Sequence, residues 1–399
     1  MNVIIGCSSP IDKGSGILTY CKNLIRGLIK GGHKVLFIAP RSMNSSYLEE
    51  LKVNKFEFDL NAPPADVCKN IVYSMREFEP DLIINNDNCY LQQVAPLFDC
   101  RFVVVGHLAN YAIGSLLPLN SEYVDEYIAI SNDMKFDMVK KYNIAPYKIK
   151  VAHNGLISDY SDCVNNTRGK KNNVNRKVKV LFGGENSSRK GADLAISLFK
   201  KLDFSKFEVY WTVSNLPNDL ESKIIKLGVN ITGRLTHEDF KTVLKNTDYL
   251  LMPSREEGCP MLLLEAMREG VIPVVSNGTG AMKEIIQHGI NGYICDLSDW
   301  SNEAYSILNM SIVLNNMNYL KGNSKNTFFQ SYANSEFLHA ILSSSHRIPS
   351  KLEPSNYIDI FDWHRRGREP GTILKSFENR IRYRFGLLKW VKKMSCMEF

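Results

Sequence analysis

Two acidic side chains flank the start of a predicted helix that follows a short buried strand. Glu257 lies in the loop before this helix, and Glu265 follows after seven intervening residues, about a turn inside it. Pro260 is expected at the first helical position, where its missing N–H leaves no bond unmade. The amides of Met261 and Leu262 then face out of a helix N-terminus, where aligned peptide dipoles favour an anion. One site could therefore hold a phosphate on amides and sugar hydroxyls on carboxylates.

The motifs of this stretch are in register with a known pattern. They are Pro-Ser at residues 253–254, Glu-Gly-x-Pro at 257–260, Glu-Ala-Met at 265–267 and Gly-x-x-Pro-Val at 270–274. Together they resemble the donor-site signature of retaining GT-B glycosyltransferases of family 4. A lone glutamate pair is more often a solvated helix face, but the whole run of matches favours a site. The resemblance covers residues 1–295 and is most specific over 180–295.

The resemblance implies an α/β protein of the GT-B class, with two Rossmann-like domains facing across a cleft and a C-terminal helical tail. The acceptor domain is expected at residues 1–161, a polar linker at 162–177 and the nucleotide-sugar donor domain at 178–335. Residues 336–399 would hold helices that return to the first domain, followed by a basic tail. A length of 399 residues fits two domains better than one core.

The implied reaction is transfer of a hexose from a nucleotide sugar to an acceptor hydroxyl, with retention at the anomeric carbon. The donor's own phosphate oxygen would accept the acceptor proton, so no separate base is required. Glu257 is expected to hold the sugar hydroxyls, Glu265 the nucleotide ribose, and Lys190 with the Met261 and Leu262 amides the diphosphate. The sequence contains no Asp-x-Asp motif and no His/Cys cluster. We therefore expect no metal and no cofactor, the nucleotide sugar being a substrate.

A basic pair follows the predicted strand at residues 178–183. Arg189-Lys190-Gly191 resembles the family's basic motif, which supplies cations to the donor diphosphate. Cleavage of the sugar–phosphate bond leaves negative charge on the nucleotide, and fixed cations stabilise it as it develops. A solvated pair is the plain alternative, although cations fit poorly at a positive dipole end unless an anion binds there. Relatives commonly have arginine where this chain has Gly184, so one phosphate cation is missing or comes from elsewhere.

Further residues of the second domain are assigned by the same resemblance. Gly233 and Arg234 belong to a turn that resembles the one meeting the nucleotide base, mainly through backbone groups. Gly258 lies in the loop that carries Glu257 and is expected to contact the donor. Glu284 either orients the site or is a solvated helix glutamate.

The N-terminal residues predict a Rossmann-type opening of strand, glycine loop, helix and strand. The loop is not the dinucleotide fingerprint, because Thr19 stands where a third glycine should be. Gly16 resembles the family's glycine loop, which approaches the donor diphosphate and the acceptor. His107 follows a predicted strand at residues 102–106, at the end where open α/β sheets bind ligands. The resemblance implies that His107 meets the transferred sugar, and a loop histidine with a local hydrogen bond is the alternative.

Composition limits the class of protein and its compartment. A hydrophobic content of 44% and a charged content of 23% are those of an ordinary globular protein. The nine cysteines are scattered and include no Cys-x-x-Cys pair, which indicates a reducing compartment. No apolar run is long enough for a bilayer, and the N-terminus lacks a signal-peptide pattern. We expect a cytoplasmic protein.

The excess positive charge is concentrated at the C-terminus. Residues 351–399 contain eleven Lys or Arg against six Asp or Glu, a balance of +5 out of +7 for the chain. Residues 376–393 place apolar side chains on one helical face and basic ones on the rest, a pattern typical of a helix on anionic lipid. Packing on the protein's own core is the alternative. The expected partners are thus a saccharide or lipid-linked saccharide acceptor and the inner face of the plasma membrane, and no nucleic acid.

Three other functions fit parts of the sequence. A nucleotide-sugar epimerase of the same architecture would need no acceptor. A non-catalytic glycosyltransferase-like subunit stays open because of Gly184. A two-domain dehydrogenase is excluded by the missing third glycine and by the lack of an acidic residue at the expected offset. The favoured interpretation is a hexosyltransferase of surface polysaccharide or lipopolysaccharide biosynthesis.

Overall fold

The computed structural model describes residues 1–11, 16–43, 46–107, 114, 116–157, 176–233, 235–314, 317–333 and 336–343. The chain forms two compact units. Unit 1 consists of Met1–Ile130, Met134–Ala152 and the chain from Leu338 onward, and unit 2 consists of Ser131–Asp133 and His153–Phe337. The basic segment at 376–393 lies outside the described residues, as do most of the predicted linker and Arg234.

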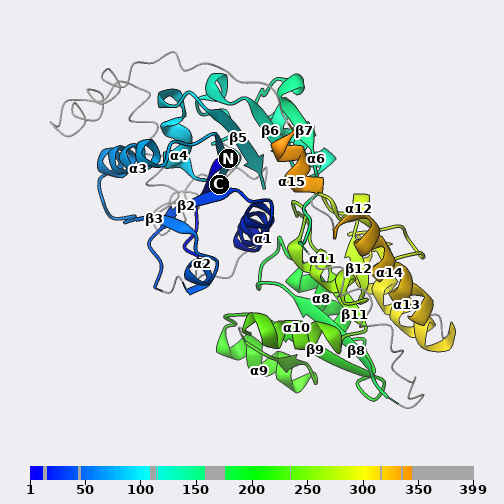
Figure 1. Ribbon diagram of the computed structural model, residues 1–399. Helices are drawn as coiled ribbons and strands as arrows, with labels where there is room; N and C mark the ends of the chain where they lie inside the picture. Colours follow the sequence, from blue (N-terminus) through cyan, green and yellow to red (C-terminus); the bar gives the residue numbers. More distant parts are fainter. Residues whose placement is uncertain are drawn as a thin grey trace, which may run out of the picture. The chain divides into compact units, whose positions relative to one another are not determined.

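Unit 1 is built on a parallel sheet whose strand order is β3-β2-β1-β4-β5-β6-β7 (Figure 1). The strands are β1 Asn2–Cys7, β2 Lys34–Pro40, β3 Asn54–Phe58, β4 Leu82–Asn86, β5 Arg101–Gly106, β6 Glu126–Ala129 and β7 Ile149–Val151. The helices are α1 Gly16–Lys30, α2 Ser46–Glu50, α3 Pro64–Phe78, α4 Cys89–Gln93 and α6 Asn132–Lys140. Because the strands are parallel, their carboxyl ends share one edge of the sheet.

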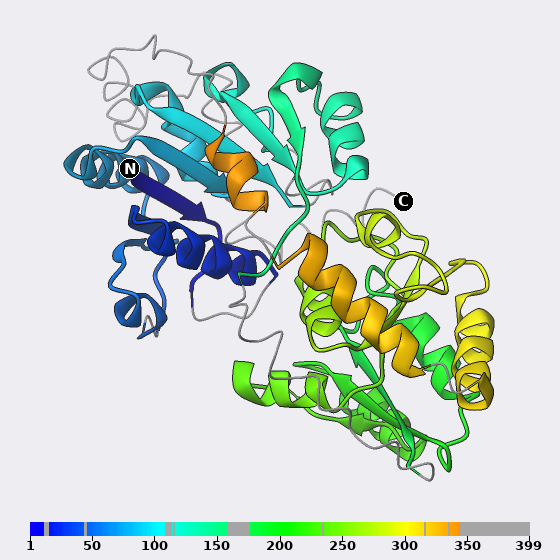
Figure 2. The ribbon, with the colours of Figure 1, turned by 45° about the vertical axis from the view of Figure 1, so that its right-hand side comes forward.

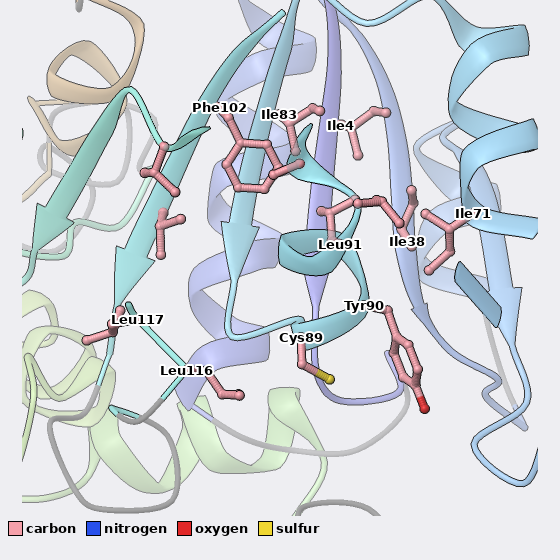
Figure 3. Packing of buried hydrophobic residues seen from close by; sticks show 14 of the residues in the cluster. Ile4, Ile38, Ile71, Ile83, Cys89, Tyr90, Leu91, Phe102, Leu116 and Leu117 are labelled. Atoms are coloured by element: carbon pink, nitrogen blue, oxygen red, sulfur yellow. The ribbon is translucent and has the colours of Figure 1, made fainter. Parts of the chain in front are cut away.

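Both faces of this sheet are buried, which explains why its strands are continuous apolar runs rather than alternating ones. On one face, Ile4 pairs with Ile83, and Ile83 pairs with Phe102 across three neighbouring strands. Figure 3 shows these side chains under the short helix α4, whose Leu91 packs over them. The opposite face is covered by α1, whose residues at helical spacing are buried as its sequence predicts.

The last described helix, α15 at Glu336–Leu342, ends at the edge of unit 1. Arg101 of β5 donates hydrogen bonds to the carbonyls of Ile341 and Leu342. These are terminal carbonyls that no residue within the helix can satisfy, so a cation there pairs with the negative end of the dipole. Arg101 thus fixes the end of α15 on unit 1.

Unit 2 has a second parallel sheet, in the order β10-β9-β8-β11-β12-β13. Its strands are β8 Val178–Gly183, β9 Phe207–Thr212, β10 Asn230–Ile231, β11 Tyr249–Met252, β12 Ile272–Ser276 and β13 Tyr293–Cys295. Its helices are α8 Ala192–Phe199, α9 Asn218–Lys226, α10 His237–Lys245, α11 Met261–Arg268, α12 Met282–Ile285, α13 Trp300–Leu314 and α14 Met317–Ser331. In this unit α14 packs along α11 (Figure 2).

A buried carboxylate joins several segments at the amino edge of the second sheet. Asp248, which directly precedes β11, is 1% exposed at its side chain and accepts two hydrogen bonds from Arg176, at 2.7 and 2.6 Å. It also pairs with Lys321 of α14 and accepts the amide of Lys179 in β8 at 2.9 Å. Burial alone would raise the pKa of Asp248, but these partners hold it below its ordinary value. The anion therefore ties β8, β11 and α14 together.

The strand predicted at residues 178–183 is confirmed as β8, and the one predicted at 102–106 is β5, which begins one residue earlier, at Arg101. Thr236 caps α10 by accepting the amide of Asp239. The expectation that Pro260 is the first helical residue is wrong. Pro260 is the N-cap, with an extended ψ of 120°, and Met261 begins the helix.

The described helices include none that is long and apolar enough to cross a membrane. 

Replacing Asp248 with Asn should destabilise unit 2 by about 3 kcal/mol at neutral pH, because two partly solvated cations lose a buried counter-ion. The folded-state pKa of Asp248 is depressed, so its stabilisation exists above the ordinary Asp pKa and is lost as pH falls. The deficit of the variant should therefore shrink below about pH 4. The loss of stability can be measured by urea unfolding, monitored through the fluorescence of the buried Trp211 and Trp300. Asp203→Asn is the control, because Asp203 pairs with Lys206 at the exposed surface, and it should leave the urea midpoint unchanged. An unchanged midpoint for Asp248→Asn would show that Asp248 does not stabilise unit 2.

Candidate active site

Two loops of unit 2 meet because β8 and β11 are neighbours in its sheet although they lie about 70 residues apart. The amide of Arg255, after β11, donates to the carbonyl of Arg189, after β8, at 2.8 Å. The Arg255 guanidinium binds both oxygens of Asp193 at 2.8 and 2.7 Å. Gly191 has φ +68°, and a Cβ there would lie 2.0 Å from the carbonyl oxygen of Pro253. Only glycine allows so close an approach of the two loops.

The loops bring Lys190 and Glu257 into direct contact. Lys190 Nζ lies 2.6 Å from Glu257 Oε1, which also accepts the hydroxyl of Ser254 at 2.7 Å. Arg189 Nη1 is 3.7 Å from the other oxygen, Glu257 Oε2. Glu257 is only 8% exposed, so these contacts are strengthened by the low local dielectric. Arg189 Nη2 also lies 3.2 Å from Glu185 Oε1, so the two cations here face two carboxylates.

The N-terminus of α11 follows on the same loop. Pro260 carries no N–H, and the amides of Met261 and Leu262 have no acceptor among the residues that the structure describes. The first intrahelical amide with a described acceptor is that of Leu263, which donates to the Pro260 carbonyl at 3.1 Å. Both unused amides lie at the positive end of the helix dipole. This end of α11 is thus equipped to bind an anionic oxygen, as the sequence predicts.

Contacts from remote segments hold the loop between Glu257 and Pro260. Asn154, 3% exposed, donates from Nδ2 to the carbonyl of Cys259 at 2.7 Å. On the other side, the amide of Ala281 donates to the Gly258 carbonyl at 2.7 Å. Gly280 has φ +111°, and a Cβ there would lie 1.9 Å from the carbonyl oxygen of Glu257. The role of Asn154 has no signal in the local sequence, because its partner lies 105 residues away.

Glu284 is neither solvated nor directed at the glutamate–lysine pair. Its carboxylate accepts the amide and the side-chain Nδ2 of Asn132, at 2.9 and 2.7 Å, and lies 2.9 Å from His153 Nε2. Nearby, Asp133 accepts the amide of Gly280 at 2.8 Å and pairs with Lys283 at the same distance. These bonds anchor two short segments of the chain to α12 and its preceding turn, so Glu284 and His153 have structural parts.

Glu265 is a half-buried carboxylate that makes no hydrogen bond or ion pair within the described part of the chain. Burial raises its pKa from the ordinary value of 4.5 to about 7, and the positive charge of Arg268 lowers it only partly. An ionisable group in this state has unused acceptor capacity. It is therefore suited to bind hydroxyl groups of a ligand.

The remaining predicted residues of unit 2 lie in turns. Gly233 has φ +64° just after β10, and Arg234 lies outside the described residues. The carbonyl of Gly184 accepts the indole N–H of Trp211 at 2.9 Å. A Cβ at Gly184 would meet only ordinary contacts at 3.4 Å or more, so the backbone there does not require glycine. In the described residues, no group of three or more His, Cys, Asp or Glu could hold a metal ion.

Two predicted site residues belong to unit 1. Gly16 begins α1 directly after the loop that follows β1. His107 follows β5 at the carboxyl edge of the sheet and is 5% exposed. Its Nε2 lies 3.1 Å from Asn86 Oδ1, at the end of β4, and its ring packs edge-on against Tyr20 with centroids 4.9 Å apart. The imidazole is thus held in one orientation at the edge where such sheets bind ligands.

Sequence profiles of two families match the chain. The profile of Glycosyltransferase Family 4 matches residues 14–159, and that of Glycosyl transferases group 1 matches residues 164–327. This chain belongs to the GT-B glycosyltransferases of the family 4 type. The family resemblance seen in the sequence is thereby confirmed, and so is the two-sheet α/β fold that it implies.

Three relatives show how far the likeness extends. An uncharacterised 41.2 kDa protein of the cps region of Klebsiella pneumoniae is 30% identical over 169 residues, which cover 41% of this chain and 46% of that protein. An uncharacterised glycosyltransferase of Methanocaldococcus jannaschii is 25% identical over 318 residues, 69% of this chain and 80% of that one. The crystal structure of Anabaena HepE in complex with UDP and glucose has a TM-score of 0.70 at 17% identity, covering 86% of this chain and all (100%) of HepE. The match thus spans about half the length of the first relative, and the likeness to HepE is one of fold.

Glu265→Gln should make unit 2 more stable at about pH 8, by on the order of 2 kcal/mol. The folded protein holds the Glu265 proton more tightly than the unfolded chain, because its folded-state pKa is raised to about 7. Its favourable contribution is therefore complete below the ordinary Glu pKa and is lost as pH rises through about 7. Urea midpoints of wild type and variant should coincide near about pH 5 and diverge above it. Parallel curves over the whole range would show that Glu265 is solvated.

Proposed function

We propose that the protein is a retaining hexosyltransferase that moves a sugar from a nucleotide-sugar donor to a hydroxyl of a saccharide acceptor. One observation carries the proposal. Lys190, on the loop after β8, pairs with Glu257 on the loop that leads into α11, and the first two amides of α11 have no described acceptor. Cation, carboxylate and helix end are the three groups that a sugar diphosphate requires. The family to which the chain belongs supports the same activity.

Each group has a defined part in the proposed reaction. The Met261 and Leu262 amides and Lys190 bind the diphosphate, and their positive charge stabilises the leaving nucleotide as the sugar–phosphate bond breaks. Glu257 accepts hydrogen bonds from the sugar, and Glu265 from the ribose of the nucleotide. A donor phosphate oxygen accepts the proton of the attacking hydroxyl, so the protein needs no separate base. The charge is met by these groups, and the proposed transfer needs no metal.

The rearrangement at Glu257 is a direct consequence of its contacts. Oε1 of Glu257 is shared by Lys190 and Ser254. When a diphosphate binds, Lys190 turns from the carboxylate to the phosphate and frees an oxygen of Glu257 for a sugar hydroxyl. The ion pair thus keeps the partly buried Lys190 and the buried Glu257 neutralised until the donor binds.

In unit 1 we propose that His107 contacts the transferred sugar and that Gly16 allows close approach of the backbone to donor and acceptor. The hydrogen bond to Asn86 fixes the imidazole ring, so its remaining nitrogen keeps a set direction. These roles rest on the family resemblance and on the position of both residues at the carboxyl edge of the sheet.

The relatives support a choice of donor and pathway. HepE was solved with UDP and glucose, which makes UDP-glucose the first donor to test. The Klebsiella relative is named for the cps region, which favours polysaccharide biosynthesis for this chain as well. We propose a lipid-linked saccharide of a surface polysaccharide as acceptor, with the basic segment at 376–393 binding anionic lipid.

Lys190→Met should lower the turnover of UDP-glucose by at least about a hundredfold, because a fixed cation is lost where negative charge develops. It should also reduce the thermal stabilisation that UDP gives to the wild type. Hydrolysis or transfer can be followed by proton NMR, which resolves the anomeric signals of the product. Retention requires that the α anomer of the sugar appears first.

Lys200→Met is the matched control, because Lys200 is an exposed lysine at the end of α8 with no described side-chain partner. It should leave turnover unchanged. Equal rates for Lys190→Met and Lys200→Met would contradict the proposal. Turnover of the wild type to a β product first would contradict retention, and an altered nucleotide sugar as product would identify an epimerase.

A further inference from the structure

A groove of about 520 Å³ opens in unit 1 between strand β3 and helix α3. Its floor is the outer rim of the hydrophobic core, formed by Phe58 and Val67 together with Phe56. The groove lies beside the outermost strand of the sheet, because β3 pairs only with β2. It is therefore separate from the groups assigned to the reaction.

One face of α3 forms a wall of the groove. Val67, Asn70, Ser74 and Glu77 are spaced by three, four and three residues, so they lie along a single helical stripe. Tyr73 stands next to this stripe and is 53% exposed, a high value for a large aromatic side chain. Arg41, which follows β2, lines the groove as well.

Two polar side chains of the groove are already bonded, since Glu57 accepts the hydroxyl of Ser42 and Asp59 accepts the amide of Asn61. Within the described part of the chain, no side-chain hydrogen bond or ion pair involves five of its lining residues, namely Arg41, Asn70, Tyr73, Ser74 and Glu77. They comprise a guanidinium, an amide, a phenol, a hydroxyl and a carboxylate, which offer both donors and acceptors. Such a mixture around an apolar floor is suited to a ligand with hydroxyl groups on an apolar ring.

Charge decides between classes of ligand. The lining holds three carboxylates, those of Glu57, Asp59 and Glu77, against the one guanidinium of Arg41. This balance disfavours phosphates, acidic lipids and nucleic acid. The exposed Tyr73 ring offers a face on which the C–H groups of a pyranose can pack, and the surrounding groups can bond its hydroxyls. We propose that the groove between β3 and α3 is a second binding site, for a neutral saccharide.

The position of the groove indicates what it would hold. Arg41 and Asp59 directly follow β2 and β3, so one end of the groove reaches the carboxyl edge of the sheet, where His107 also lies. Four strand spacings separate β3 from β5, a distance of about 19 Å. A saccharide chain bound in the groove could thus extend along this edge. The groove holds the non-reacting sugars of a long acceptor, and this assignment, unlike the binding itself, rests on the proposed function.

The test is binding of the full-length chain to an array of neutral oligosaccharides, compared with Tyr73→Ala and Tyr147→Ala. Tyr147 is the matched control, a tyrosine of the same unit that is 82% exposed and lies outside the groove. We expect the signal on the bound glycans to fall by about fivefold or more in Tyr73→Ala, equivalent to a lost contact of about 1 kcal/mol, and to stay unchanged in Tyr147→Ala. Glu77→Gln should weaken binding as well. Stabilisation by UDP-glucose should be the same in all four proteins.

An identical array profile for wild type and Tyr73→Ala would overturn the inference, as would binding only to sulfated or other acidic glycans, or to none. If wild type shows no response to UDP-glucose but binds neutral glycans through Tyr73, the proposed function fails and the saccharide site stands. If wild type responds to UDP-glucose and the Tyr73→Ala variant binds glycans as well as wild type does, the saccharide site fails and the proposed function stands.

Discussion

A single charge-assisted contact, from Lys190 Nζ to Glu257 Oε1, organises the candidate site of unit 2. It joins a loop after β8 to a loop after β11, and it places a cation beside the mouth of α11. Both side chains are largely buried, so each needs the other in the absence of a ligand. A diphosphate would replace the carboxylate as the partner of the lysine. The same bond therefore neutralises Glu257 and keeps a cation beside the N-terminus of α11.

The backbone around this contact tolerates little change. Gly191 and Gly280 both adopt positive φ, and in both a Cβ would collide with a carbonyl oxygen of the loop that carries Glu257. Asn154 and Ala281 hold that loop from two other segments. On the opposite edge of the sheet, Asp248 fixes β8 and β11 to α14. The sheet and these hydrogen bonds and ion pairs thus position the two loops. The chemistry depends on a few side chains that the loops carry.

The sequence predicts what is local or repeated, and it fails where partners are remote. The apolar strands β1, β8 and β11 could be found because each is buried on both faces. The short strands β7 and β13 have three residues each and carry too little pattern. The motif around Glu257 indicates a donor site, which stays a prediction, and the structure places Lys190 beside Glu257. The contacts of Asn154 and Glu284 could not be predicted, because they join segments more than 100 residues apart.

The most direct measurement is a crystal structure of the protein with UDP. The account predicts diphosphate oxygens within hydrogen-bonding distance of the Met261 and Leu262 amides, Lys190 Nζ on a phosphate oxygen rather than on Glu257, and the ribose hydroxyls on Glu265. A nucleotide bound elsewhere, or a diphosphate that leaves the Lys190–Glu257 pair intact, would contradict it.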